Sequence, residues 1–518
     1  MPQSVSTQPP KSALSWYDTA SEASSPRHSR RHGIAETIRS SIGPSTHVEI
    51  EDRRSHRDSR TSGPTTPQLL YGQIWPEPPQ ANHFNSERAS MRLLNSPLAK
   101  LANERLNSTT PGTSSDGPLA VQKVPAGPIG IRDRISHFTW AWFTITISTG
   151  GLAVLLHEQP HQFTGLITIG KVVYIFNLVL FVTFCSLLTT RFALNRKALW
   201  ASLTSPSELF FIPTFLLSLA VIIAGMPLYG LSSTGPWLLT TTRVLFWLFA
   251  ALVLLVSLVL FLLITAFPAP ASKLNPLTMA SPAWLLPILP TLLTGTIASL
   301  IVPTQPAQHR LSIIVAGITF NGLGYTMAMA LTSLVLLRLF ASGLPPPSQR
   351  PSLFILVAAP AFTAAALIAN ARALPGSTGA YLSAHPGAAD ALAAIALWSA
   401  IFLWLLAAWF FLFAAAATLL IPCARPRYRQ AWWAMVFPNV GFAVATAEVA
   451  RELQSAAIAW VATAITLVVV VVWLALAGLV VRAVWKGDVL WPGRDEDVDE
   501  DLQETVVGGS AGSSVKAC

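Results

Sequence analysis

The chain has 518 residues, of which 52% are hydrophobic and only 11% are charged, and its formal net charge is +9 at pH 7. A soluble protein of this size needs a more polar surface, so this composition excludes one and indicates an integral membrane protein. The three cysteines are isolated in the sequence, so we expect no disulfide framework, no metal site and no cofactor.

Residues 1–130 differ from the rest because they are rich in Ser, Pro, Thr and Arg and contain no sustained apolar run. Such a segment cannot bury enough surface to fold, so we predict a disordered cytosolic tail. Four Ser-Pro or Thr-Pro pairs in it are candidate phosphorylation sites, although chance occurrence in so biased a segment is the alternative. They begin at Ser25, Thr66, Ser96 and Thr110. Residues 491–518 form a second tail, which is acidic.

Residues 131–490 contain ten apolar runs of about 20 residues, the length that crosses a bilayer. The runs begin near Phe138, Ile167, Ser207, Trp237, Ser281, Leu311, Ser352, Ala391, Ala431 and Ala456. We therefore predict an all-α integral membrane protein with ten transmembrane helices.

Basic residues are concentrated in alternate loops between these runs. One set of loops contains Arg191, Arg196, Lys197, Lys273, Arg338, Arg350, Arg425, Arg427 and Arg429, and the other contains only Arg310, Arg372 and Arg451. Cytosolic loops carry the excess of Lys and Arg, so the first set is predicted to be cytosolic. Both termini then lie in the cytosol, as an even number of spans requires.

Helix-breaking residues recur in every second run. The third, fifth, seventh and ninth runs contain prolines about 73 to 78 residues apart, and the first contains a glycine pair at the corresponding place. These residues are Pro213, Pro287, Pro360 and Pro438, with Gly150 and Gly151 in the first run. The spacing predicts five two-helix hairpins of the same orientation, related by an axis along the membrane normal and closing into a ring.

A proline inside a helix frees a backbone carbonyl, which lipid cannot satisfy. We therefore expect the odd-numbered helices to be kinked and to line a central pore, with the even-numbered helices outside them. The spans contain few carboxylates, which argues for an anion pathway rather than a cation pathway.

Polar side chains on the odd helices are the candidates for contact with the anion. They are Thr144, Ser148, Thr291, Thr294 and Asn439, and the alternative is that each bonds its own helix or a neighbouring one. Arg372 and Arg451 end two odd helices on the predicted outer side. They either attract a dicarboxylate to a vestibule or extend to the lipid headgroups.

Four stretches resemble a known family: HFTWAWFTITISTGG, QPHQFTGLITIGKVVYIFNLVLF, ELFFIP and AWWAMVFPNVGFAVAT. They are similar to the fungal malic acid transport proteins, which are C4-dicarboxylate permeases of the tellurite-resistance and dicarboxylate transporter family. Plant slow anion channels and fungal sulfite efflux pumps are relatives. The likeness spans roughly residues 131–490 and implies ten helices in five hairpins around a central pore, often in a homotrimer.

The resemblance also implies a gate. In the channel branch a phenylalanine beside the ninth-helix proline plugs the pore, and Phe437 occupies that position here. Phe211, in the third run, matches a second pore-facing aromatic residue of that branch. The alternative for both is packing against lipid or the protein core. Asn177 stands where the permeases are expected to have an aspartate, which argues against coupling to protons.

We therefore predict a plasma-membrane transporter of malate and related dicarboxylates, with no nucleic-acid partner. The alternatives are an exporter of sulfite or another small anion, and a gated anion channel. An enzyme is disfavoured because the runs contain no cluster of His, Asp, Glu or Cys. The direction of transport, its coupling and the preferred anion stay open at this point.

Overall fold

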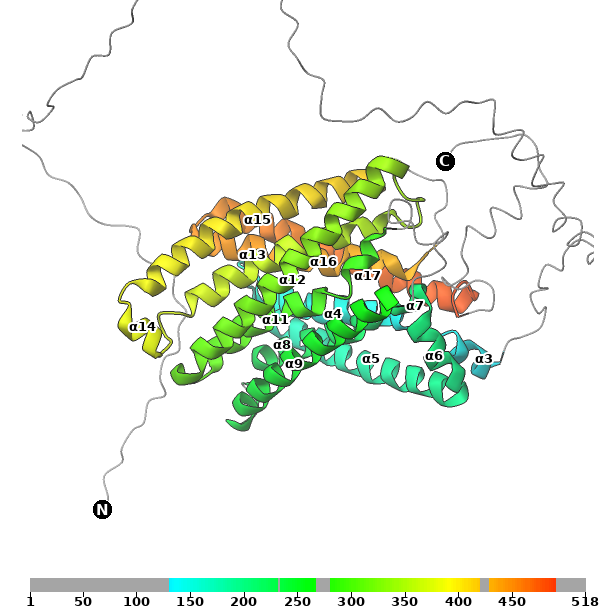
Figure 1. The fold of residues 1–518 in the computed structure, drawn as a ribbon, viewed down its shortest axis with the longest axis horizontal. Helices are drawn as coiled ribbons and strands as arrows, with labels where there is room; N and C mark the ends of the chain where they lie inside the picture. Colours follow the sequence, from blue (N-terminus) through cyan, green and yellow to red (C-terminus); the bar gives the residue numbers. More distant parts are fainter. Residues whose placement is uncertain (1–129, 232, 267–279, 420–427, 491–518) are drawn as a thin grey trace, which may run out of the picture. The chain divides into compact units, whose positions relative to one another are not determined.

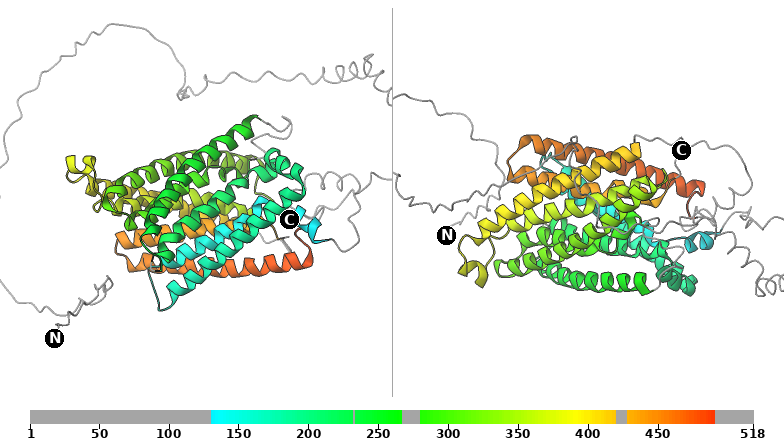
Figure 2. Two further views of the ribbon diagram at one scale, coloured as in Figure 1. Left: turned by 90° about the horizontal axis from the view of Figure 1, so that it is seen from below. Right: turned by 45° about the horizontal axis from the view of Figure 1, so that its top comes forward.

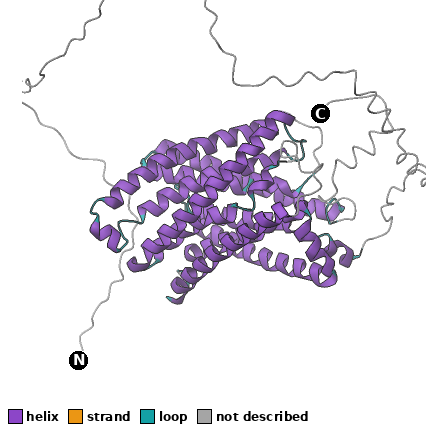
Figure 3. Cartoon of the chain, in the orientation of Figure 1, coloured by secondary structure: helices purple, strands orange, loops and turns teal. Residues whose placement is uncertain are grey.

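The computed structural model describes residues 130–231, 233–266, 280–419 and 428–490. The tails at 1–129 and 491–518, with the four candidate phosphorylation sites, lie outside these residues. The described part of the chain forms helices and contains no strand (Figure 3). This confirms the predicted all-α fold.

Nine helices in the described ranges are long and apolar enough to cross a membrane. Their α-helical parts are α4 (Phe143–His157), α5 (Leu166–Leu194), α8 (Ile212–Gly230), α9 (Trp237–Ala266), α12 (Ala307–Ser342), α13 (Ile355–Arg372), α15 (Ala388–Leu419), α16 (Phe437–Glu452) and α17 (Ala456–Lys486). A shorter apolar helix, α11 (Leu289–Ile301), occupies the fifth position. The predicted number of ten spans requires that α11 also crosses the bilayer.

Four short α-helices complete the described part of the chain. They are α3 (Ile131–Ser136), α6 (Arg196–Thr204), α7 (Pro206–Leu209) and α14 (Ala380–Ala384). A buried ion pair joins α7 to α5, and a hydrogen bond from α6 to the same carboxylate holds α6 beside them. Arg191 donates two hydrogen bonds of 2.9 and 2.6 Å to the carboxylate of Glu208, which also accepts one of 2.5 Å from Ser202.

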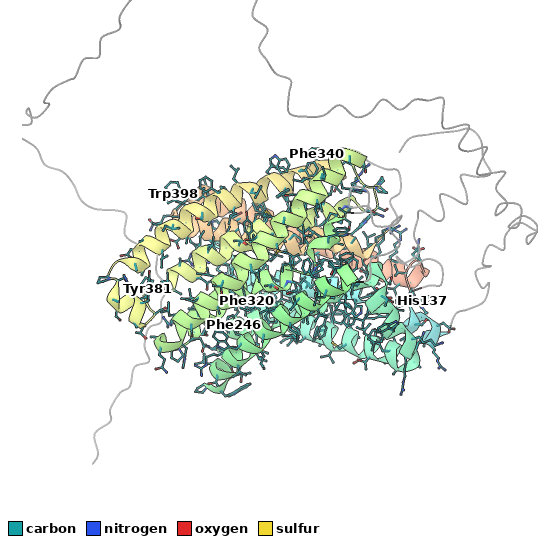
Figure 4. The ribbon with its side chains drawn as sticks, in the orientation of Figure 1. His137, Phe246, Phe320, Phe340, Tyr381 and Trp398 are labelled. Atoms are coloured by element: carbon teal, nitrogen blue, oxygen red, sulfur yellow. The ribbon has the colours of Figure 1, made fainter. Side chains whose placement is uncertain are left out.

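Burial alternates along the chain. In the long odd-numbered spans, 72% to 89% of the most apolar 18-residue stretch is buried, whereas in the even-numbered spans only 17% to 28% of the corresponding stretch is buried. In α11 every residue except Thr296 and Leu300 is buried. Figure 4 labels Phe340 of α12 and Trp398 of α15, which are 86% and 66% exposed and lie on the outer helices. Large apolar side chains on the outer helices are suited to contact with lipid.

The inner helices contact one another in chain order and close on themselves. α4 packs on α8, α8 on α11, α11 on α13, α13 on α16, and α16 on α4. Each inner helix also packs on the outer helix that follows it, namely α5, α9, α12, α15 or α17. In Figure 1 α4 and α11 lie between α5 on one side of the bundle and α15 on the other. Both views of Figure 2 place the red-orange α17 at an edge.

The breaks in the inner spans are helix starts rather than kinks at most of the predicted positions. Pro213 and Pro438 are the second residues of α8 and α16. The first turn of an α-helix lacks acceptors for its N–H groups, so proline fits there without loss of a hydrogen bond. Pro287 lies in a turn ahead of α11. Of the four prolines predicted to kink the inner spans, only Pro360 lies inside an α-helix, α13.

Short 3₁₀ segments or a short helix precede the inner α-helices. The 3₁₀ segments are η1 (Trp140–Trp142), η2 (Pro282–Leu285), η4 (Arg350–Phe354) and η5 (Gln430–Met435), and α7 takes this place before α8. Each inner span therefore changes its helical geometry part of the way along its length.

The glycine pair of the first span has a role different from the predicted one. α4 runs through Gly150 and Gly151 without interruption, and the change of helix type lies ahead of them at Phe143. A Cβ atom added at Gly150 would lie only 2.5 Å from a methyl group of Val221, and one added at Gly151 only 3.0 Å from the ring of Phe437. The pair allows close packing because a larger residue does not fit between these helices.

Candidate transport pathway

The five inner helices enclose a cavity of about 600 Å³, a volume that includes its open mouth. It is lined by Gly151, Val154 and Glu158; by Ala220, Val221 and Ala224; by Leu293, Thr296, Ile297, Ser299 and Leu300; by Phe362, Ala365 and Ala369; and by Phe437, Val440, Val444 and Glu448. The lining is almost entirely apolar, and every inner helix contributes to it.

On α16 the lining residues follow helical spacing and lie along one face. Phe437, Val440, Val444 and Glu448 succeed one another at intervals of three or four residues. On α4 the lining begins at Gly151 and continues toward the C-terminal end of the helix. The cavity therefore has an aromatic end near Phe437 and a charged end near Glu448.

Two stacked rings close the aromatic end. The ring centroids of Phe362 and Phe437 are 4.9 Å apart with an interplanar angle of 29°. The two side chains are buried, with 5% and 7% of their surface exposed. Each ring lies close to a glycine of another inner helix: a Cβ atom added at Gly151 would lie 3.0 Å from the ring of Phe437, and one added at Gly441 would lie 2.7 Å from that of Phe362.

Ion pairs surround the charged end. Glu448 accepts one hydrogen bond of 2.6 Å from Arg451 and a second from Arg372. Arg451 also donates to the carboxylate of Glu158 at 2.9 Å and to its main-chain oxygen at 2.6 Å. Arg372 donates from its Nε to Glu452 at 2.8 Å. Both predicted arginines therefore lie at the mouth of the cavity, and both are paired with carboxylates.

Glu158 lies just beyond the first span and stays ionised at low pH. Burial by itself raises the pKa of Glu158, but the hydrogen bond with His157 and the charge and hydrogen bond of Arg451 outweigh this and lower the pKa to about 2. Its pairing with Arg451 fastens the end of α4 to α16.

The predicted hydroxyl and amide ligands lie outside the lining of this cavity. Thr144, Ser148 and Thr294 donate to the main-chain oxygens of Ala141, Trp433 and Pro290 at 2.6, 3.3 and 3.5 Å. The amide nitrogen of Asn439 donates to Met435 at 2.7 Å. Among these five candidates, two side-chain atoms have no hydrogen-bond partner, Oγ1 of Thr291 and Oδ1 of Asn439, and both belong to the third residue of an inner α-helix.

Of the aromatic and helix-breaking candidates, two line the cavity and the others do not. Phe437 and Gly151 line the cavity. Phe211 does not, and it packs half-buried against the main hydrophobic core at the start of α8. Gly150, Pro213, Pro287, Pro360 and Pro438 also lie outside the lining, in the positions given above.

Sequence reasoning missed two prominent residues of the cavity, Phe362 and Glu448. Phe362 lies two residues after the proline of the seventh span, and Phe437 lies one residue before the proline of the ninth span, so each is an aromatic residue close to an inner-span proline. Glu448 lies on the face that begins at Phe437, three helical turns further along α16. Both residues could have been found from the sequence by comparison with Phe437, through the nearby proline for Phe362 and through the shared helical face for Glu448.

A closed ring of buried helices around an apolar cavity, sheathed by helices with apolar outer surfaces, is the architecture of a membrane channel or transporter. The chain belongs to the voltage-dependent anion channel family, whose model matches residues 137–481.

Three similar proteins are relevant to the substrate. A malic acid transport protein of Schizosaccharomyces pombe is 34% identical over 376 residues, which are 72% of this chain and 84% of that protein. A putative malic acid transport protein of the same organism is 34% identical over 374 residues, 72% of this chain and 85% of that protein. A sulfite efflux pump of Trichophyton rubrum is 26% identical over 357 residues, 67% of this chain and 91% of that protein.

Proposed function

We propose that the chain transports malate and related C4-dicarboxylate anions across the plasma membrane through the cavity, with Phe437 and Phe362 as its gate. The observation that carries the proposal is the cavity, which all five inner helices line and which two stacked rings close at one end. The identity of 34% to a malic acid transport protein supports the choice of substrate.

The two rings are physically suited to gating. A narrow apolar constriction excludes water, and an ion does not enter it without its hydration shell. Rotation about χ1 moves a phenylalanine ring aside without disturbing the backbone. Stacking itself adds only about 0.5–1.5 kcal/mol beyond the burial of the rings, so it opposes their separation only weakly as long as they stay buried.

The distribution of basic residues supports an orientation for this pathway. It assigns the ends of the inner helices near Glu448 to the outside and both tails to the cytosol. The cavity is then an outer vestibule, and the rings separate it from the cytosolic half of the pathway. In this arrangement α11 is the fifth of ten spans in five hairpins. The resemblance to the family supports a homotrimer.

The anion-binding candidates lie in the first halves of the inner helices α4, α11 and α16, outside the lining of the cavity. Thr291 and Asn439 lie in the first turns of α11 and α16, where the helix dipole favours an anion. The hydroxyl of Thr291 has no partner and is free to donate to a carboxylate. Thr144, Ser148 and Thr294 each have one proton and donate it to a carbonyl, so they bind the anion only if they change partners.

Efflux of sulfite or another small anion is the second candidate function. It is favoured by the 26% identity to a sulfite efflux pump. Sulfite has a compact anionic group, whereas malate has two carboxylates separated by a carbon chain. Competition between the two anions therefore distinguishes the candidates.

The decisive experiment is uptake of radiolabelled malate by yeast that lacks its own transport and expresses this chain. We expect uptake that succinate and malonate inhibit and that sulfite does not. Tolerance to sulfite without malate uptake contradicts the proposal. Anion currents that far exceed the turnover of a carrier identify a gated channel instead.

A pair of variants tests the route. Ala369 lines the cavity, so Ala369→Trp fills it and should abolish uptake. Ala251 lies on the exposed face of α9, so Ala251→Trp adds the same side chain on the lipid side and should leave uptake unchanged. Equal uptake by the two variants, at equal amounts in the membrane, contradicts transport through the cavity.

A further inference from the structure

The charged mouth of the cavity has the wrong sign for an anion pathway. The carboxylates of Glu158, Glu448 and Glu452 face the guanidinium groups of Arg372 and Arg451, which leaves an excess of negative charge. Among the residues that the structure describes, His157 contacts Glu158, and the ring of Tyr229 packs on His157. Such a mouth repels an incoming anion unless an arginine releases one of its partners.

Glu448 differs from the other two carboxylates because it bridges both arginines. One of its oxygens accepts a hydrogen bond from Arg451 and the other from Arg372, whereas Glu158 and Glu452 each pair with a single arginine. Glu448 lines the cavity and is only 3% exposed. Its carboxylate therefore lies between two cationic groups at the entrance to the pathway.

The arginines remain accessible from the solvent although both are paired. The side chains of Arg372 and Arg451 keep 42% and 34% of their surface exposed. Arg372 ends α13, and Arg451 lies in the last turn of α16. An anion in the mouth can therefore reach a guanidinium group on each of two helices. A carboxylate is the anion that best matches the planar set of donors on a guanidinium group.

We propose that Glu448 is a resident competitor for the substrate, whose carboxylate must take the place of the Glu448 carboxylate on Arg372 and Arg451 before the anion enters the cavity. This inference rests on the proposed function. It follows that the two arginines select for a molecule with two carboxylates, because each arginine can then bind one of them. A monocarboxylate such as lactate satisfies only one arginine and competes poorly with Glu448.

The test is Glu448→Gln, which keeps the size of the side chain and removes its charge. Both arginines then lose their shared anionic partner, and we expect the KM for malate to fall about tenfold without a rise in kcat. Asp390→Asn is the matched control, since it removes a carboxylate from the exposed first turn of the outer helix α15, outside the cavity lining and outside the ion pairs of the mouth. Its KM should stay within about threefold of the wild-type value, because exposed charges contribute little.

We would measure KM and kcat for malate and lactate with purified protein in liposomes, and the thermal stabilisation of the same proteins by succinate. Glu448→Gln should increase the stabilisation at a given succinate concentration, a readout that does not depend on transport. Equal KM values and equal stabilisation for the wild-type and E448Q proteins overturn the exchange.

Two further outcomes are decisive. If E448Q does not fold, Glu448→Asp retains the charge but shortens the side chain, which should lower KM by a smaller factor, and an unchanged KM again overturns the exchange. A wild-type protein that neither transports a dicarboxylate nor is stabilised by one refutes the proposed function itself. Failure of the proposed function is visible in the wild-type protein by itself, whereas failure of the exchange is visible only when E448Q is compared with the wild-type protein.

Discussion

Gly441→Ala tests the ring gate through a single methyl group. A Cβ atom at this position lies 2.7 Å from Cε2 and 2.8 Å from Cδ2 of Phe362. Carbon atoms in ordinary contact are about 3.5–4.0 Å apart, so the ring of Phe362 has to retreat by about 1 Å. That movement disturbs its stack on Phe437, whose ring centroid is 4.9 Å away.

The strain belongs to the closed gate and is relieved when Phe362 moves. Overpacking of a well-packed site costs about 1–3 kcal/mol, so the population of the open gate should rise by about fivefold to 150-fold. The assay is the rate of anion leak from liposomes that contain the purified G441A protein, compared with the wild-type protein at the same reconstituted amount.

Two other glycines separate a leak from a loss of stability. Gly317→Ala places a Cβ atom 2.4 Å from that of Ala298, away from the cavity lining, so it should lower the melting temperature without a leak. Gly478→Ala meets no atom within 4 Å and should change neither property. A leak in G441A equal to that of the wild-type or G317A protein refutes the assignment of Phe362 to the gate.

Three other predictions concern the gate and the ion pairs. Phe437→Ala and Phe362→Ala should each raise unregulated anion flux, and the double variant should exceed the larger single effect only slightly because the rings act together; an unchanged flux for F437A at normal surface expression rejects the gate. Glu158 has a pKa lowered from 4.5 to about 2, so its pairing stabilises the folded state above about pH 4.5, and this stability is lost as the pH falls toward 2. The difference in melting temperature between the wild-type and E158Q proteins should therefore be constant from pH 7 to 5 and narrow below about pH 4; a difference that disappears between pH 7 and 5 contradicts the pairing. Arg191→Gln leaves Glu208 buried without its cationic partner, which should cost about 3–5 kcal/mol and be visible as a lower melting temperature in detergent.

The division into inner and outer helices could be predicted from the sequence because a bilayer restricts where backbone polar groups can be freed. Prolines in every second apolar run indicated which helices are shielded from lipid, and the burial of α8, α13 and α16 agrees with this. The local structure at those prolines could not be predicted in the same way. Both a kink and a helix start accommodate proline, and the choice between them depends on the 3₁₀ segment that precedes Pro438.

The ion pairs of Arg372 and Arg451 could not be predicted from the sequence, for a different reason. Arg372 and Arg451 end their spans, so counting loop charges describes them as available cations. Their partners come from other helices, and Glu158 is separated from Arg451 by 293 residues. Charge counting along the chain does not detect a contact between residues that only the closure of the ring brings together.

The same three helices hold both ends of the cavity. At the aromatic end α4 contributes Gly151, α13 contributes Phe362 and α16 contributes Phe437. At the charged end the chain just after α4 contributes Glu158, α13 contributes Arg372, and α16 contributes Glu448, Arg451 and Glu452. A shift of α16 against α4 or α13 therefore changes the ion pairs and the ring contacts together, because neither set lies on one helix alone. An anion that takes Arg372 from Glu448 removes an ion pair between α13 and α16, and these two helices carry the stacked rings.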